Sequence, residues 1–150
     1  MPVKDTDKGL KALLGRLKNG KRLSLTVGIH GPEGSEPEQG TGVTILEVAT
    51  INEFGIGVPE RSFIRGWYDE NEVKNYDILR KIGYAVHKGI YDARTGLERV
   101  GLVFVGDIQR RMQGLPPPNA PSTIAKKGSS TTLVDKGQLK SSILSKVTEE

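Results

Sequence analysis

The 150-residue chain contains no cysteine. It therefore cannot form disulfide bonds, use a thiolate as a nucleophile or bind zinc through sulfur. A domain of about 150 residues buries roughly 70% of the surface that its unfolded chain exposes, so it needs no such cross-link to hold a core. We expect one soluble domain over residues 1–150, made in a reducing, intracellular compartment.

Long hydrophobic runs are also missing. The N-terminal segment lacks the apolar core and small-residue cleavage site of a signal peptide, and no later segment approaches the roughly 20 apolar residues of a membrane span. We expect no targeting segment and no membrane partner. Aromatic residues make up only 5% of the chain. The net charge of +4 is too small and too dispersed to demand a nucleic-acid partner.

Hydrophobic spacing predicts both helices and strands in the first half of the chain. Leucines spaced three and four apart over 10–17 predict a short helix, and strict alternation over 22–29 predicts a half-buried strand. Residues 30–42 combine glycine, proline and glutamate without an apolar residue, which predicts a mobile acidic loop. The segment 43–54 fits a strand or a helix, and we favour a helix that ends at Gly55.

Two amphipathic helices are predicted after a loop that ends near residue 65. The residues that mark their buried faces are Val73, Tyr76, Leu79, Gly83, Val86 and Ile90 in the first and Leu97, Val100, Phe104, Ile108 and Met112 in the second. Two pairs stand at the expected helix starts, Asp69/Glu72 and Thr95/Glu98, and the second fits the capping-box pattern. Prolines predict an extended arm over 114–132. Leu139 and Ile143 then predict a helical turn, followed by a short strand through Leu144 and Val147.

Catalytic and metal-binding groups do not converge in this sequence. The chain has only two histidines, His30 and His87, and its glycine-rich segments lack the order of a phosphate-binding loop. The acidic residues at 69–72 suit a helix start, and those at 149–150 suit a solvated terminus. We expect no enzymatic activity, no catalytic residue, no metal and no cofactor.

The segment 52–67 is the most distinctive part of the chain. It concentrates aromatic residues around two arginines and a proline, a mixture that is enriched at protein–protein interfaces. The aromatic residues are Phe54, Phe63 and Trp67. The alternative is that Phe63 and Trp67 fill the core while Arg61 pairs with Glu53 or Glu60. Both interpretations stay open, and both can hold together.

Two blocks of sequence resemble a known family. ATINEFG at 49–55 with VPERSFIR at 58–65 resembles the "NEFG…IPxRPFLR" block of phage tail-completion and tail-terminator proteins, in particular the virion morphogenesis family of Mu-like phages. PPNAPSTIAKKG at 117–128 with LVDKGQLKSSI at 133–143 is similar to the same family's "PPxxxSTxxxKG…PLVDTGxLxxSI" ending. Ser62, Thr132 and Lys136 depart from the pattern, which usually has proline, proline and threonine there.

This resemblance implies a small α+β protein, with a mixed or antiparallel sheet flanked by helices, a long acidic loop and an extended C-terminal arm. It implies a structural protein of the virion neck that assembles in the host cytoplasm as a ring, commonly a hexamer. Such a ring caps the tail tube and meets the head–tail connector. The residues expected to hold the turn of the first block or contact a neighbour are Glu53, Phe54, Gly55, Pro59, Arg61, Phe63, Arg65 and Trp67. Those expected to make contacts from the arm and its end are Pro117, Pro118, Lys126, Lys127, Asp135 and Leu139.

The alternative function is a head-side connector adaptor or a nucleic-acid-binding accessory protein. Basic residues in the C-terminal part could contact phosphates, and a ring could touch DNA incidentally in its lumen. These residues are Lys126, Lys127, Lys136, Lys140 and Lys146. They lack the interleaved aromatic residues of a single-strand binder. A steep salt dependence of DNA binding would favour this alternative.

Overall fold

The computed structural model describes residues 22–37, 42–115 and 137–149, together with the single residues 9, 11 and 15. Most of the predicted helix over 10–17 and most of the predicted arm over 114–132 lie outside the described residues, as does the segment 133–136. None of the described helices is both long and apolar enough to cross a membrane.

The described residues form an α+β fold with one two-stranded antiparallel sheet. The elements in chain order are β1 (Leu23–Ile29), α2 (Gly31–Gly34), α3 (Ile45–Phe54), α4 (Arg65–His87), α5 (Ala93–Arg111), α7 (Gln138–Ser141) and β2 (Ile143–Glu149). The predicted strands, the helix that ends at Gly55, the two long helices and the helical turn at Leu139 are confirmed. Ile143 is a correction, because it begins β2 instead of belonging to that turn.

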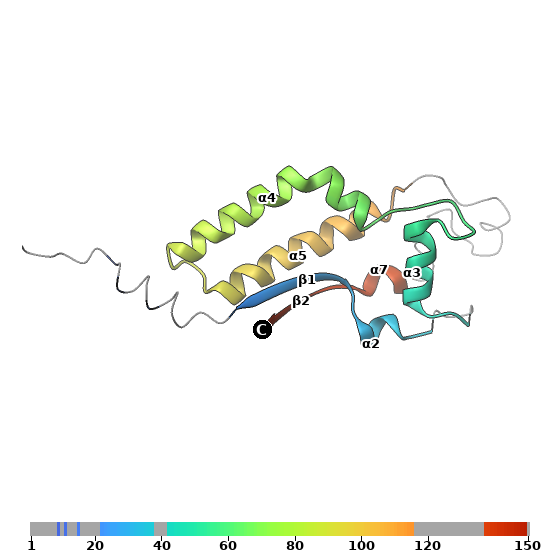
Figure 1. Ribbon diagram of the computed structural model, residues 1–150, viewed down its shortest axis with the longest axis horizontal. Coiled ribbons are helices and arrows are strands. Elements are labelled where there is room, and N and C mark those ends of the chain that lie inside the picture. Colours follow the sequence, from blue (N-terminus) through green and yellow to red (C-terminus); the bar gives the residue numbers. More distant parts are fainter. Residues whose placement is uncertain are drawn as a thin grey trace, which may run out of the picture.

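Helix α5 lies between the sheet and α4 (Figure 1). β1 and β2 pair from Leu23 opposite Glu149 to Ile29 opposite Ile143, and both strands contact α5. The approach of α5 to the sheet is close, because a Cβ atom on Gly101 would lie only 2.6 Å from Ser145 Cβ. The short elements α2, α3 and α7 gather at one end of this stack.

One core joins the sheet, α5, the start of α4 and the end of the stack. Its buried apolar residues are Ile45, Ala49, Phe63, Trp67, Val100, Phe104, Ile108, Met112, Leu139 and Ile143. Trp67 meets Phe104 edge to face, with ring centroids 5.1 Å apart. Such aromatic pairs add about 0.5–1.5 kcal/mol beyond the apolar area that they bury, so this contact helps to lock α4 onto α5.

The acidic segment predicted to be a loop over 30–42 is not entirely a loop, because it contains the helical turn α2. Pro32 stands in the first turn of α2, where a missing backbone N–H costs nothing and the fixed φ angle suits a helix. Ser35 donates its hydroxyl to Gly31 O at 2.7 Å. A Cβ atom on Gly34 would lie 3.1 Å from Ile29 Cγ2 and 3.3 Å from Leu46 Cβ, and Pro37 forms a bridge with Thr44.

Thr95 was expected to cap the start of α5, and this expectation is wrong. Helix α5 begins after Asp92, whose carboxylate accepts hydrogen bonds from Thr95 N at 2.9 Å and Thr95 Oγ1 at 2.6 Å. Thr95 is therefore capped rather than capping. The capping box lies at α3, where Thr44 and Glu47 satisfy each other's backbone N–H groups.

The face of α4 expected to be buried is also wrong in part. Val73, Tyr76 and Leu79 are exposed, as is Ile90 beyond the helix. The helix instead packs through Trp67, Asn75, Ile78 and Ile82. Among the described residues α4 packs mainly against α5, which covers one of its two apolar stripes.

Candidate interaction site at the turn between α3 and α4

The carboxylate of Glu53 organises the turn. Glu53 lies in the last turn of α3 and the residue is 6% exposed. Its oxygens accept hydrogen bonds from four donors in the residues just before and at the start of α4. These donors are Ser62 Oγ at 2.8 Å, Phe63 N at 2.8 Å, Ile64 N at 3.0 Å and Arg65 N at 2.9 Å.

This carboxylate acts as the N-terminal cap of α4, supplied from another helix. Ile64, the N-cap residue, has no side chain that caps the helix. The first N–H groups of a helix lack partners and carry partial positive charge, so a buried carboxylate is stabilising there. Ser62 completes the cap because its hydroxyl accepts from Gly66 N at 2.9 Å while it donates to Glu53. Helix α4 consequently starts at Arg65, before the predicted start near Asp69.

Arg65 covers the turn on its outer side. Its guanidinium donates to the carboxylate of Glu60 at 2.8 Å and to Glu53 O at 3.1 Å. The same group lies 4.7 Å from the centroid of the Phe54 ring, a cation–π contact. The core interpretation expected Arg61 to pair with Glu53 or Glu60. In the structure Arg65 forms ion pairs with both carboxylates.

Arg61 is held against the end of α3. Its backbone N donates to Asn52 O at 2.8 Å, and its guanidinium donates to Asn52 Oδ1 at 3.3 Å. Arg61 is buried, and this burial lowers the pKa of its guanidinium. Gly55 makes the sharp reversal possible. Its φ angle is 69°, and a Cβ atom there would lie 3.0 Å from Glu60 N.

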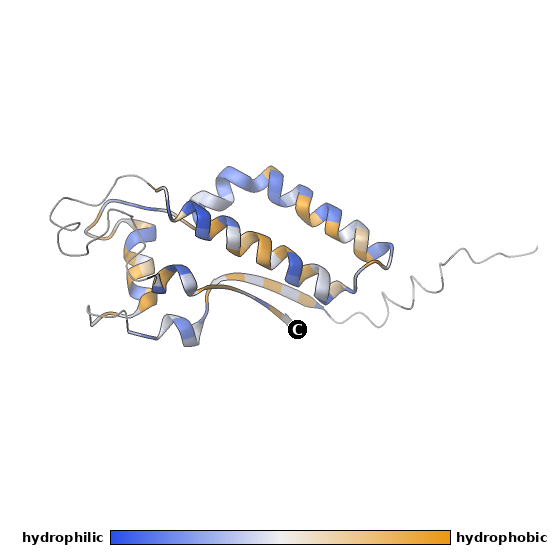
Figure 2. Ribbon diagram, turned by 180° about the vertical axis from the view of Figure 1, so that it is seen from behind, coloured by the Kyte–Doolittle hydropathy of each residue, from blue (hydrophilic) through white to orange (hydrophobic). Residues whose placement is uncertain are grey.

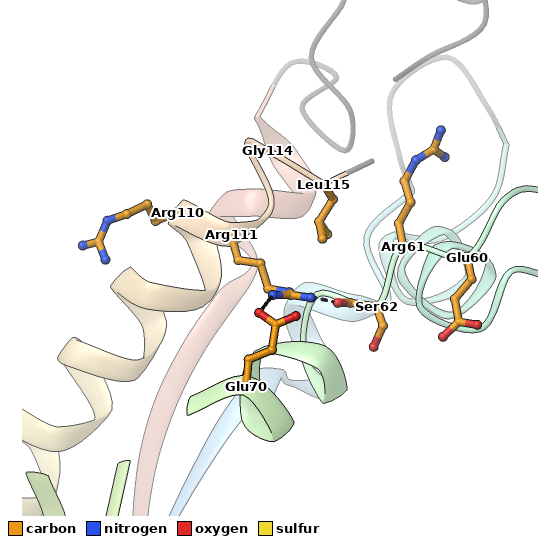
Figure 3. Close-up of a pocket in the computed structure, with 8 residues that line it drawn as sticks. All are labelled: Glu60, Arg61, Ser62, Glu70, Arg110, Arg111, Gly114 and Leu115. Atoms are coloured by element: carbon orange, nitrogen blue, oxygen red, sulfur yellow. Dashed lines mark hydrogen bonds and ion pairs between the residues drawn. The ribbon is translucent and has the colours of Figure 1, made fainter. Parts of the chain in front are cut away.

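An open hollow of about 610 Å³ borders the turn (Figure 3). It is lined by Glu60, Arg61, Ser62, Glu70, Arg110, Arg111, Gly114 and Leu115. Arg111, from the end of α5, donates to Ser62 O at 3.1 Å and pairs with Glu70 of α4. A Cβ atom on Gly66 would lie 2.6 Å from Arg111 Nη2, so glycine there leaves room for this arginine.

A second ion-pair cluster links α4 to α5 beside the hollow. Asp107 accepts from Lys74 at 2.6 Å and from Arg110 at 2.7 Å. Burial raises the pKa of Asp107, but the hydrogen bonds and charges of Lys74 and Arg110 outweigh it and hold the pKa below its usual value. The hollow therefore combines cationic groups with carboxylates that already bind them.

The outer tip of the turn is apolar. Phe54 is 56% exposed, Ile56 is 57% exposed, and Val58 and Pro59 are also exposed. Within the described residues no group of three or more His, Asp or Glu side chains could hold a metal ion. The arrangement of an apolar tip beside arginines suits contact with a protein surface.

The structure divides the residues expected from the first block into two sets. Glu53, Phe63 and Trp67 are buried, which confirms the core interpretation of the two aromatic residues. Phe54 and Pro59 face outward, and the Arg65 side chain is 53% exposed. Of the residues expected to act from the arm, Leu139 is buried in the core. Pro117, Pro118, Lys126, Lys127 and Asp135 lie outside the described residues.

Three residues of the site escaped the sequence analysis. Ser62 was seen only as a departure from proline, although its hydroxyl is a common helix-capping group. Asn52 gave no local signal, and neither did Arg111, which reaches a carbonyl 49 residues away.

Comparisons with protein-family models, curated proteins and solved structures found no match to this chain.

Proposed function

We propose that the chain is a structural protein of a phage neck, which assembles as a ring that terminates the tail tube and allows it to join the head. A hexamer is the expected ring, with the tail tube protein and the head–tail connector as partners. The role is one of assembly, in the virion and in the host cytoplasm before it, rather than catalysis.

The meeting of the two sequence blocks supports this proposal most. Helix α3 and the turn carry the first block, and α7 with the start of β2 carries the end of the second. They contact one another, and Ile45 and Ala49 share a core with Leu139 and Ile143. Two segments about 80 residues apart that resemble the same family thus form one structural unit.

The outer tip of the turn is the surface that we assign to contact between ring subunits. A head-to-tail ring joins one face of each subunit to a different face of the next. The tip offers exposed Phe54, Ile56 and Val58 at its end, with Arg65 stacked on Phe54 beside it. Apolar and aromatic side chains next to arginine are the composition that anchors such contacts.

Electron microscopy of lysates from a phage that lacks this gene tests the proposal. Abnormally long tail tubes are expected, because nothing would stop tube growth, and supplying the wild-type gene should restore normal length. Normal-length tails lying beside filled, tailless heads would move the role to the joining step. Intact virions in the absence of the gene would contradict the proposal.

A further inference from the structure

The outward face of α4 carries a regular stripe of six residues, which we call the outer stripe. Its members are Asp69, Val73, Tyr76, Arg80, Gly83 and His87. They follow spacings of four and three in turn, so they share one face of the helix, opposite the face that packs on α5. Val73 is 84% exposed and Tyr76 is 70% exposed, and Tyr84 beside the stripe is also exposed. Figure 2 shows that α4 mixes hydrophilic and hydrophobic residues along its length.

The outer stripe also contains a glycine, Gly83, which is unusual inside a helix. It lies inside a 23-residue helix, where glycine lowers helix stability relative to alanine. A Cβ atom at Gly83 would meet nothing within 4 Å among the described residues, so no contact with them requires glycine there. Small residues on a helix face allow a second helix to approach closely. The position therefore suits a helix that lies across α4 from outside.

The charges of α4 are divided along its length. In the first half Asp69, Glu70 and Glu72 outnumber the two cations Arg65 and Lys74. In the second half Arg80 and Lys81 outnumber Asp77, and Lys88 follows just after the helix. The side chains of Arg80 and Lys81 stay 68% and 71% exposed although both contact Asp77. Two copies of α4 that run in opposite directions would place each acidic half against a basic half. Two copies running in the same direction would place like charges together.

We propose that a second copy of this chain binds the outer stripe, with the two α4 helices antiparallel about a two-fold axis between residues 76 and 80. In this register Val73 of one copy packs into the space beside Gly83 of the other. The Tyr76 ring lies against the Arg80 guanidinium, a cation–π contact made twice by symmetry. Asp69 faces His87 at both ends. The stripe is thus complementary to itself, as a two-fold contact requires.

The contact is modest in size and separate from the ring contact assigned to the tip of the turn. A helix of 23 residues is about 35 Å long, and one pair of such helices is near the lower end of specific interfaces. We therefore expect a dimer that forms reversibly at micromolar concentration.

Disulfide trapping tests both the contact and its direction. The chain has no cysteine, so an introduced thiol is the only one. Val73→Cys protein is mixed with Gly83→Cys protein that carries a tag, and the mixture is oxidised mildly. The mixed dimer should exceed the control mixtures about tenfold, because the contact raises the effective thiol concentration. The Cα atoms of bridged cysteines must lie within roughly 7 Å, so the trap reports this register closely.

Two controls distinguish the proposed contact from random collision and from parallel pairing. Leu102→Cys, on an exposed position of α5, replaces Gly83→Cys in the matched control mixture. Val73→Cys oxidised alone reports parallel pairing, since those two positions lie far apart in the antiparallel dimer. Enrichment of the Val73–Gly83 pair supports the proposal, whatever happens to ring assembly. Equal yields in all mixtures, or a dominant Val73→Cys dimer with itself, would overturn it.

Discussion

The turn between α3 and α4 and the outer stripe of α4 are close in sequence but use their side chains in opposite ways. In the turn, the Glu53 carboxylate accepts four hydrogen bonds from the same chain, and Phe63 is completely buried. On the outer stripe, Val73 and Tyr76 face solvent. The difference separates two roles. The inner half of the turn holds the fold together, whereas the surfaces that we propose for partners lie at its tip and along α4.

Glu53→Ala should give the largest loss of stability. It removes the acceptor of three backbone N–H groups and one hydroxyl, in a site with almost no water access. Removing one member of a buried charged network costs about 3–5 kcal/mol. We expect the free energy of unfolding to fall by that amount in urea titrations followed by circular dichroism.

Glu60→Ala is the matched control for that experiment. Glu60 also binds Arg65, but its side chain is 57% exposed. Exposed ion pairs contribute about 0–1 kcal/mol. A loss of similar size in both variants would mean that burial of the Glu53 carboxylate is not what stabilises the turn.

Phe63→Ala and Phe54→Ala compare the two sides of the turn with the same substitution. Phe63 is 0% exposed, and deleting a buried phenylalanine side chain costs about 3–5 kcal/mol. Phe54 is 56% exposed, so Phe54→Ala should change the free energy of unfolding by about 0.5 kcal/mol. If the tip binds a neighbouring subunit, Phe54→Ala should nevertheless fail to restore tail length in the gene-deletion phage. Normal complementation by Phe54→Ala would remove the tip from the ring contact.

Gly101→Ala and Gly83→Ala should have opposite signs. At Gly101 the added methyl would collide with Ser145 of β2, and overpacking of this kind costs about 1–3 kcal/mol. At Gly83 the methyl meets open space, so helix propensity should raise the free energy of unfolding by about 0.5–1 kcal/mol. Thermal unfolding of dilute protein measures both. A destabilised Gly83→Ala monomer would show that this position is constrained within the chain.

The smallest expected effect is the acid sensitivity contributed by Asp107. Its pKa is lowered in the fold, so its stabilisation is present above the unfolded value of about 3.9 and is lost as pH falls through the folded value. Because Lys74 and Arg110 are largely exposed, Asp107→Asn should cost about 1 kcal/mol or less at pH 7. The two proteins should converge in urea titrations below the folded pKa. A difference that persists there would assign the effect to packing.

Much of the fold could be predicted from periodicity alone. Alternation over 22–29 indicated β1, and Gly55 indicated the end of α3, because both patterns act over neighbouring residues. The buried face of α4 could not be predicted in the same way. Its sequence carries two apolar stripes, and which one is covered depends on how α4 packs against α5.

The sequence marked the turn as a candidate site but did not reveal which groups its side chains bind. Glu53 was singled out as part of a block, yet its partners are backbone N–H groups up to 12 residues later, which no side-chain pattern reveals. The Thr44–Glu47 capping box was present in the sequence and overlooked. Thr95–Glu98 has the same pattern but loses to Asp92, which caps the helix three residues earlier.

Hydrogen exchange of the Phe63, Ile64 and Arg65 amides tests most directly whether the turn is closed within the chain. Backbone amides that are bonded to a buried carboxylate should exchange only through large openings of the structure. We expect protection of all three close to that of the α5 core amides, and its loss in Glu53→Ala under conditions where α5 stays folded. Exchange of the three wild-type amides as fast as in an unstructured peptide would contradict this.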